Sequence, residues 1–170
     1  DDLDLVQALL RAGATNVANR YGTTPLELAS VNGNPRVIEV LLQAGADAKA
    51  ATAEGETMLM TASRTGNVEA MRVLLTHGAD PNAAEKWYGE TALIWAAAEN
   101  HAPAVRLLVE AGAKVDLASK KMVFPRKVGG QTTLHVGPMT QLMYRAREGA
   151  LDAARALVEA GANLNIQDPD

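Results

Sequence analysis

A six-residue phrase that recurs five times along the chain is the feature that most restricts its fold. Each copy has two aliphatic residues, two variable residues, a glycine and an alanine. The glycines are 32, 33, 34 and 49 residues apart, so most copies keep a period near 33 and one interval is longer. Such a period is typical of stacked helical repeats, in which each unit buries its apolar face against its neighbours. The copies are Leu9–Ala14, Leu41–Ala46, Leu74–Ala79, Leu108–Ala113 and Leu157–Ala162.

The composition narrows the chemistry that the chain can perform. Aromatic residues make up 4% of the 170 residues, which suits thin, closely packed helices better than a large globular core. Cysteine is absent, which excludes disulfides, thiolate metal sites and cysteine nucleophiles. His77, His101 and His135 fit no zinc-site spacing, and no phosphate-binding glycine loop or nucleophilic serine motif is present. We therefore expect no catalytic residue, no metal site, no cofactor and no enzyme activity.

The segment 19–51 shows the plan of one unit. Thr24 and Pro25 suit the start of a helix, because the hydroxyl can accept a hydrogen bond from a free amide and proline lacks only an amide that would be unpaired there. Gly33 is expected to end this helix in the left-handed conformation, and a second helix is expected from about residue 35 to 44. The residues expected to face the core are Leu26, Leu28, Ala29, Val37, Ile38, Leu41 and Leu42.

The start of this plan, Gly-x-Thr-Pro-Leu-x-x-Ala at 22–29, recurs in weaker form at 55–62 and 89–96. Together with the five copies of the phrase, the pattern resembles the ankyrin repeat over nearly all of the chain outside 117–137. The resemblance implies an all-α solenoid of about four to five stacked repeats with projecting hairpin loops. It also implies a protein–protein interaction module, without catalysis, that presents a rigid concave surface of inner helices and hairpin tips. The alternative is a structural or self-assembling spacer array within a longer repeat protein.

The repeat plan predicts how the chain divides into units within one solenoid domain. The units are a partial first repeat at 1–18 that keeps only its second helix, repeats at 19–51, 52–84 and 85–116, an insertion at 117–137, and a last repeat with the start of a following hairpin at 138–170. The repeat at 85–116 has one additional residue before Gly89, and Arg145 stands where other units have alanine. Because both ends stop within a unit, we expect further repeats, or copies of the chain, to meet them.

The insertion is expected to form a long β-hairpin that stands off the solenoid, since β-prone segments flank Gly129 and Gly130; a disordered loop is the alternative. Residues 117–147 carry six of the sixteen basic residues and none of the twenty acidic ones, which leaves ten basic against twenty acidic residues elsewhere. We expect this basic hairpin to meet an acidic protein surface or the acidic remainder of the chain itself. Nucleic acid is less favoured, because dense arginines with interleaved aromatics are missing.

Trp87 and Tyr88 are the clearest candidates for partner contact, because two adjacent aromatics on a polar loop have little packing reason to exist. The alternative is that one of them covers the base of the neighbouring hairpin. Trp95, Tyr144 and the methionines at 58, 60, 71 and 143 are expected to pack in the core, and His77 is expected to favour a helix C-terminus. The predicted partner-binding residues are Arg20, Tyr21, Arg64, Lys86, Trp87, Tyr88, Glu90, Glu99, Lys120, Lys121, Phe124, Arg126, Lys127 and Arg147.

The location of the protein is only weakly constrained by the sequence. The first residues show no basic, apolar leader, so no signal peptide is visible. No apolar stretch approaches the roughly 18 residues of a transmembrane helix, so we expect a soluble chain without a membrane span. The compartment stays open, with the cytoplasm as one candidate, and the partner stays unidentified.

Overall fold

The computed structural model describes residues 2–11, 13, 18–20, 22–117, 150–163 and 165. These residues form helices and no strands, and their β-pairing is confined to two isolated antiparallel bridges, Ala51 with Thr57 and Ala84 with Thr91. The helices are α1 (Asp2–Arg11), α2 (Pro25–Asn32), α3 (Pro35–Gln43), α4 (Met58–Thr65), α5 (Val68–Thr76), α6 (Ala92–Ala98), α7 (Ala102–Glu110) and α9 (Leu151–Glu159).

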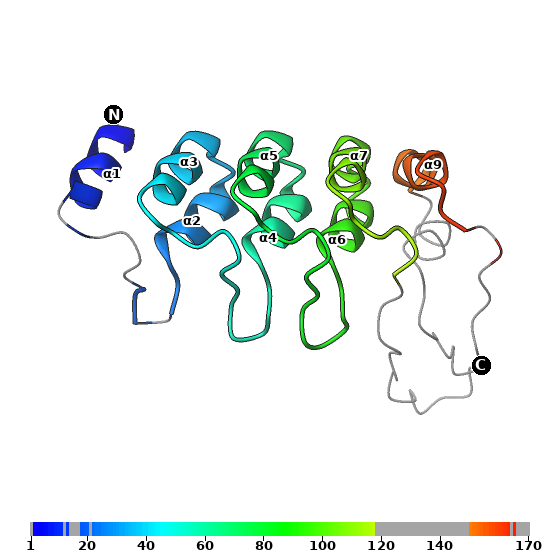
Figure 1. Cartoon of the computed structure of the whole chain (residues 1–170), viewed down its shortest axis with the longest axis horizontal. Coiled ribbons are helices and arrows are strands. Elements are labelled where there is room, and N and C mark those ends of the chain that lie inside the picture. The colour runs from blue at the N-terminus through cyan, green and yellow to red at the C-terminus, as the bar shows by residue number, and fades with distance from the viewer. Residues whose placement is uncertain are drawn as a thin grey trace, which may run out of the picture.

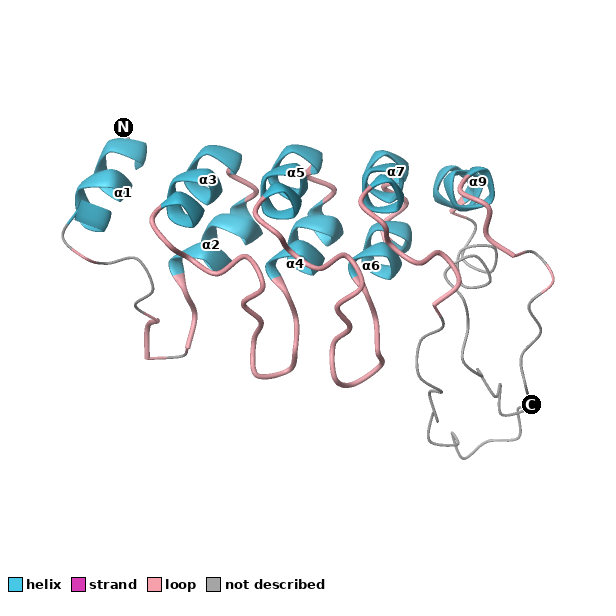
Figure 2. Cartoon of the chain, viewed as in Figure 1, coloured by secondary structure: helices cyan, strands magenta, loops and turns pink. Residues whose placement is uncertain are grey.

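The helices stack in two rows (Figure 1). One row contains α1, α3, α5, α7 and α9, which we call the outer helices. The other row contains α2, α4 and α6, the inner helices, and lies between the outer row and the loops that project from the stack (Figure 2). Each inner helix packs on the outer helix that follows it in sequence, and neighbours within each row pack on one another. This arrangement confirms the predicted all-α repeat fold, while the division into units stays a prediction.

The ends of the inner helices follow the predicted local chemistry. The hydroxyls of Thr24, Thr57 and Thr91 each accept a hydrogen bond from the amide three residues later, which satisfies an amide that the helix leaves unpaired. Gly33 ends α2 at φ 63°, in the left-handed region that glycine adopts cheaply. Asn100 adopts the same region at φ 59° after α6, where the other units have glycine.

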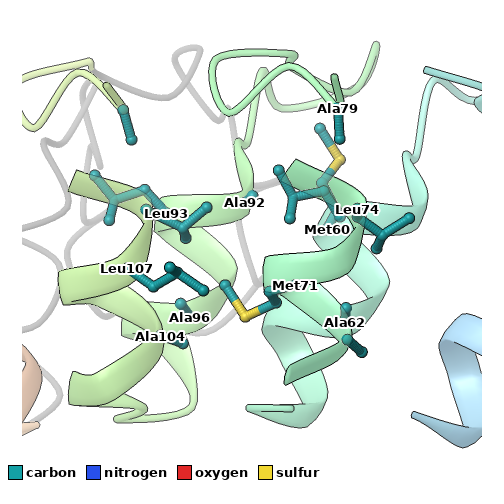
Figure 3. Close-up of a cluster of buried hydrophobic side chains, with 14 of the residues drawn as sticks. Met60, Ala62, Met71, Leu74, Ala79, Ala92, Leu93, Ala96, Ala104 and Leu107 are labelled. Atoms are coloured by element: carbon teal, nitrogen blue, oxygen red, sulfur yellow. The ribbon is translucent and has the colours of Figure 1, made fainter. Parts of the chain in front are cut away.

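The core lies between consecutive helix pairs (Figure 3). Ala62, Ala96 and Ala104 are fully buried, and their small side chains let neighbouring helices approach closely. Leucines and methionines fill the remaining space, so the prediction that Met58, Met60 and Met71 pack in the core is confirmed.

Leu28 was expected in the core, and this expectation is wrong, because the structure leaves 53% of it exposed. On the same helix, Leu26 and Ala29 face the core of the stack. Two residues along a helix correspond to about 200° of rotation, which carries Leu28 to the side opposite Leu26.

Polar side chains connect neighbouring pairs where an outer helix begins. The Asn67 Nδ2 atom donates to the Gly33 carbonyl oxygen at 2.7 Å, while its Oδ1 atom accepts from the Ala70 amide at 2.9 Å and caps α5. At the next junction His101 Nε2 lies 3.2 Å from the Arg64 carbonyl oxygen. These contacts give hydrogen-bond partners to backbone carbonyl groups at the ends of the inner helices, which would otherwise have only water as a partner.

The expected β-hairpin at 117–137 lies, apart from its first residue, outside the described residues, and no strand in the described part supports it. Tyr144, Met143 and Arg145 also lie outside the described residues. On either side of 118–149 the repeats contact each other directly. The Asn163 amide donates to Asp116 Oδ1 at 3.0 Å, and the Ala153 amide donates to Asn100 Oδ1 at 3.0 Å. The chain therefore resumes its stack, with α9 packed on α7.

Two equivalent asparagines allow the connection between repeats to be measured. Asn34 and Asn67 both cap their own helices, and among the described residues only Asn67 also bonds to the preceding repeat. We expect Asn34→Ala to lower the free energy of unfolding by about 1 kcal/mol. Asn67→Ala should lower it by about 1 kcal/mol more, because the Gly33 carbonyl loses its donor. Urea unfolding followed by circular dichroism provides the measurement, and equal losses would contradict a stabilising inter-repeat bond.

Candidate partner-binding face

The structure describes half of the predicted partner-binding residues. Arg20 is exposed in the first hairpin loop, which joins α1 to α2. The third hairpin loop, which joins α5 to α6, contains Lys86, Trp87, Tyr88 and Glu90. Arg64 is exposed on α4, and Glu99 is exposed at the C-terminal end of α6. The remaining candidates, Tyr21, Lys120, Lys121, Phe124, Arg126, Lys127 and Arg147, lie outside the described residues.

The tip of the third hairpin is organised by a buried carboxylate that the sequence did not single out. Glu85 is 7% exposed. Its Oε2 atom accepts from the Trp87 amide at 2.6 Å, and its Oε1 atom accepts from the Tyr88 amide at 2.7 Å and the Glu90 amide at 2.9 Å. One side chain thus satisfies three backbone donors and fixes the path of the chain through the two aromatic residues.

The hairpins before α2, α4 and α6 each carry, at the same position, an acceptor for the closing amide. Asn19 Oδ1 accepts from the Thr23 amide, and Thr52 Oγ1 accepts from the Glu56 amide. Glu85 does the same for Glu90, which lies five residues ahead instead of four because this loop is one residue longer. The longer side chain and its second oxygen suit the additional amides of the longer loop. The extra residue before Gly89 was therefore the available sequence signal for this arrangement.

The electrostatics of Glu85 follow from these contacts. Burial alone would raise the pKa of the Glu85 carboxyl group. Hydrogen bonds from the backbone amides of Glu90, Trp87, Tyr88 and Gly89 outweigh that effect and lower its pKa below the ordinary value of 4.5, because they stabilise the charged form. The carboxylate is therefore ionised at neutral pH, the form that accepts these bonds.

Lys86 connects the third hairpin to the second, which joins α3 to α4. Its amide donates to the Glu54 carbonyl oxygen at 2.9 Å, and its Nζ atom donates to the Ala53 carbonyl oxygen at 2.7 Å. Lys86 thus forms these hydrogen bonds to the second hairpin. Trp87 and Tyr88 remain 70% and 47% exposed.

A second cluster connects the third hairpin to the inner helices. The Trp95 Nε1 atom donates to Glu90 Oε2 at 3.0 Å, and the guanidinium carbon of Arg64 lies 5.5 Å from the centre of the Trp95 ring. Contact between a cation and an indole contributes about 0.5–1 kcal/mol at exposed sites. Trp95 was expected in the core, but it packs only partly against the core and its ring joins two of the predicted partner-binding residues, Glu90 and Arg64.

Aliphatic side chains lie exposed on the first inner helix. Leu28 on α2 occupies the position that Trp95 occupies on α6, and Val31 occupies the position of Arg64 on α4. We define the inner face as Leu28, Val31, Arg64 and Trp95 together with the aromatic tip formed by Trp87 and Tyr88. The face changes from aliphatic at α2 to cationic and aromatic at α4 and α6.

Within the described ranges, no group of three or more histidine, aspartate or glutamate side chains is placed to hold a metal ion. His77 caps the C-terminal end of α5, as expected, and its Nε2 atom lies 3.2 Å from Glu39 on α3. In the described part of the chain, no helix has the length and apolar character needed to cross a membrane.

Glu85 gives a testable link between charge and the order of the third hairpin. We expect Glu85→Gln to lower the free energy of unfolding by about 1–3 kcal/mol at neutral pH, because the amide group cannot accept the bonds made by both oxygens. The pKa of Glu85 is lowered in the folded state, so its stabilisation is present above pH 4.5 and disappears as the pH falls through the lowered value. Urea unfolding at neutral and acidic pH tests both statements. Glu54→Gln, an exposed change on the second hairpin, is the control, and a difference that persists at low pH would contradict the assignment.

Two family models match the chain. One, described as ankyrin repeats in three copies, matches residues 44–119, and the other, ankyrin repeat, matches residues 21–53. Together they span residues 21–119, which is more than half of the chain and includes every helix from α2 to α7. No curated protein matches the chain. The repeated phrase, the stacked helix pairs and the matched models agree, and the chain belongs to the ankyrin repeat family, whose members are generally non-catalytic protein-interaction modules.

Proposed function

We propose that the chain binds a partner protein across the inner face. The observation that carries the proposal is the aromatic tip, where Trp87 and Tyr88 are exposed although Glu85 holds their backbone in place. Exposed aromatic side chains on a fixed backbone contribute strongly to protein interfaces, because they bury a large area and lose little conformational freedom. Tryptophan, tyrosine and arginine dominate such interfaces, and the inner face carries all three.

A hollow lies in the surface beside the first inner helix, α2. It has a volume of about 310 Å³ and lies between residues 22–24 of the first hairpin and 50–54 of the second, with Glu27 and Met58 in its wall. Thr23 lines it, at the position where the next two units have Glu56 and Glu90. Within their own units, the Glu56 side chain accepts a hydrogen bond from Thr61 Oγ1 and the Glu90 side chain accepts one from Trp95 Nε1. The short threonine, in contrast, leaves space that a partner side chain can enter.

The aromatic tip is tested by replacing Trp87 and Tyr88 with alanine together. A partner recovered with the wild-type chain should bind the double variant at least about tenfold more weakly, since interface hot spots contribute about 2 kcal/mol or more each. Biolayer interferometry with the purified partner measures the loss. Arg36→Ala with Arg72→Ala is the control, because both residues are also exposed but lie on the outer helices α3 and α5, away from the tip. Unchanged affinity of the tip variant would remove the tip from the binding surface.

Self-association is a second candidate function, and the surface of α9 favours it. Leu151 is 73% exposed, whereas Ala102, its equivalent on α7, is buried. Val158 is also exposed, whereas its equivalent Val109 is partly buried against the core. An exposed stacking surface of this kind can pair with a further repeat or with another copy of the chain.

Self-association predicts an elution volume that depends on concentration. Size-exclusion chromatography of the wild-type chain should show a larger species as concentration rises, and Leu151→Glu with Val158→Glu should abolish it, because a charge on each surface opposes apolar contact. A wild-type chain that elutes as a monomer at every concentration would contradict this second function.

A further inference from the structure

We propose that Arg64 recognises an aspartate or glutamate side chain of the partner polypeptide. The inference rests on the proposed function and adds the chemistry of the partner. Arg64 is exposed, and among the described residues its guanidinium group forms no ion pair and no hydrogen bond, only the contact with the Trp95 ring. A planar guanidinium group with unused N–H donors matches a carboxylate through two parallel hydrogen bonds.

The guanidinium group is supported before any partner arrives. Its position is restricted by the Trp95 ring, whose Nε1 atom is bonded to Glu90 Oε2. The Glu90 amide is bonded in turn to Glu85 Oε1, the carboxylate that also holds the aromatic tip. Arg64 and the tip are therefore connected through one series of contacts. Such support reduces the conformational entropy that an arginine side chain loses on binding.

The charges near Arg64 favour a single carboxylate over a more highly charged group. Glu27 is on the preceding inner helix, Glu99 ends the next one, and Glu56 and Glu90 lie in the hairpin loops before α4 and α6. Phosphate groups are usually bound by clusters of arginines. Among the described inner helices Arg64 is the one arginine, so it complements one negative charge, and the glutamates on the adjacent inner helices and hairpins would repel a phosphate dianion.

The neighbours of Arg64 indicate what should accompany the acidic residue. On α2, which packs directly on α4, Val31 occupies the position equivalent to Arg64 and is exposed. Leu28 lies one helical turn away from Val31 on the same helix and is also exposed. A partner segment whose carboxylate reaches Arg64 therefore passes beside an aliphatic surface. We infer a recognition sequence in which an acidic residue lies close to a bulky apolar residue.

Selection from a phage-displayed library of random peptides tests this chemistry. The wild-type chain should enrich peptides with an aspartate or glutamate near a bulky apolar residue. Synthetic peptides from this pool, measured by fluorescence polarisation, should bind Arg64→Glu at least about tenfold more weakly, because attraction is replaced by repulsion. Exchange of the peptide's acidic residue for lysine should weaken binding to the wild-type chain and restore binding to Arg64→Glu.

Arg72→Glu is the matched control, because Arg72 is an exposed arginine on the outer helix α5 and the change of charge is the same. Equal effects of Arg64→Glu and Arg72→Glu, or wild-type binding that survives replacement of the peptide's acidic residue by alanine, would overturn the inference. Peptides that require Leu28 and Trp87 but ignore Arg64 would refute this inference alone. A library without binders, or binders that ignore all three residues, would count against the proposed function as well.

Discussion

The structure depends on the close approach of successive helix pairs. The buried leucines and methionines of successive pairs belong to one continuous cluster along the stack, as expected where each unit relies on its neighbours for burial. Alanines at equivalent positions, such as Ala62 and Ala96, set the distance between units because they have no side chain to separate the helices. That spacing also determines the surface. The inner helices α4 and α6 lie side by side at this spacing, which is why Arg64 can reach the Trp95 ring of the next unit.

Polar groups adapt this shared plan locally. Asn67 and His101 occupy the same junction in consecutive units, and each contacts a backbone carbonyl of the unit before it. The hairpins likewise keep one acceptor at one position, supplied by an amide, a hydroxyl and then the carboxylate of Glu85. In all three hairpins a backbone amide needs an acceptor at this position, and only the side chain that supplies the acceptor differs. In the third hairpin the acceptor is the Glu85 carboxylate, and the two aromatic side chains of that loop remain exposed.

The sequence predicted most of the fold because its signals are local. A threonine cap and a left-handed glycine act within one helix end, and their repetition revealed the stack without knowledge of tertiary contacts. The details of the inner face are different in kind. The exposure of Leu28 depends on which side of a short helix faces the stack, and the role of Trp95 depends on Arg64 from another unit and on Glu90. The function of Glu85 requires the three-dimensional path of its loop, of which the extra residue gave only a hint.

The direct bonds between Asp116 and Asn163 and between Asn100 and Ala153 join segments separated by 118–149. The third hairpin likewise holds one residue more than the second, yet α4 and α6 remain packed together. Hairpin length is thus mechanically independent of the spacing of the helices. A chain built in this way can diversify its projecting loops one at a time, by insertion or deletion, while its framework stays constant, and the same property suits it to the grafting of foreign loops.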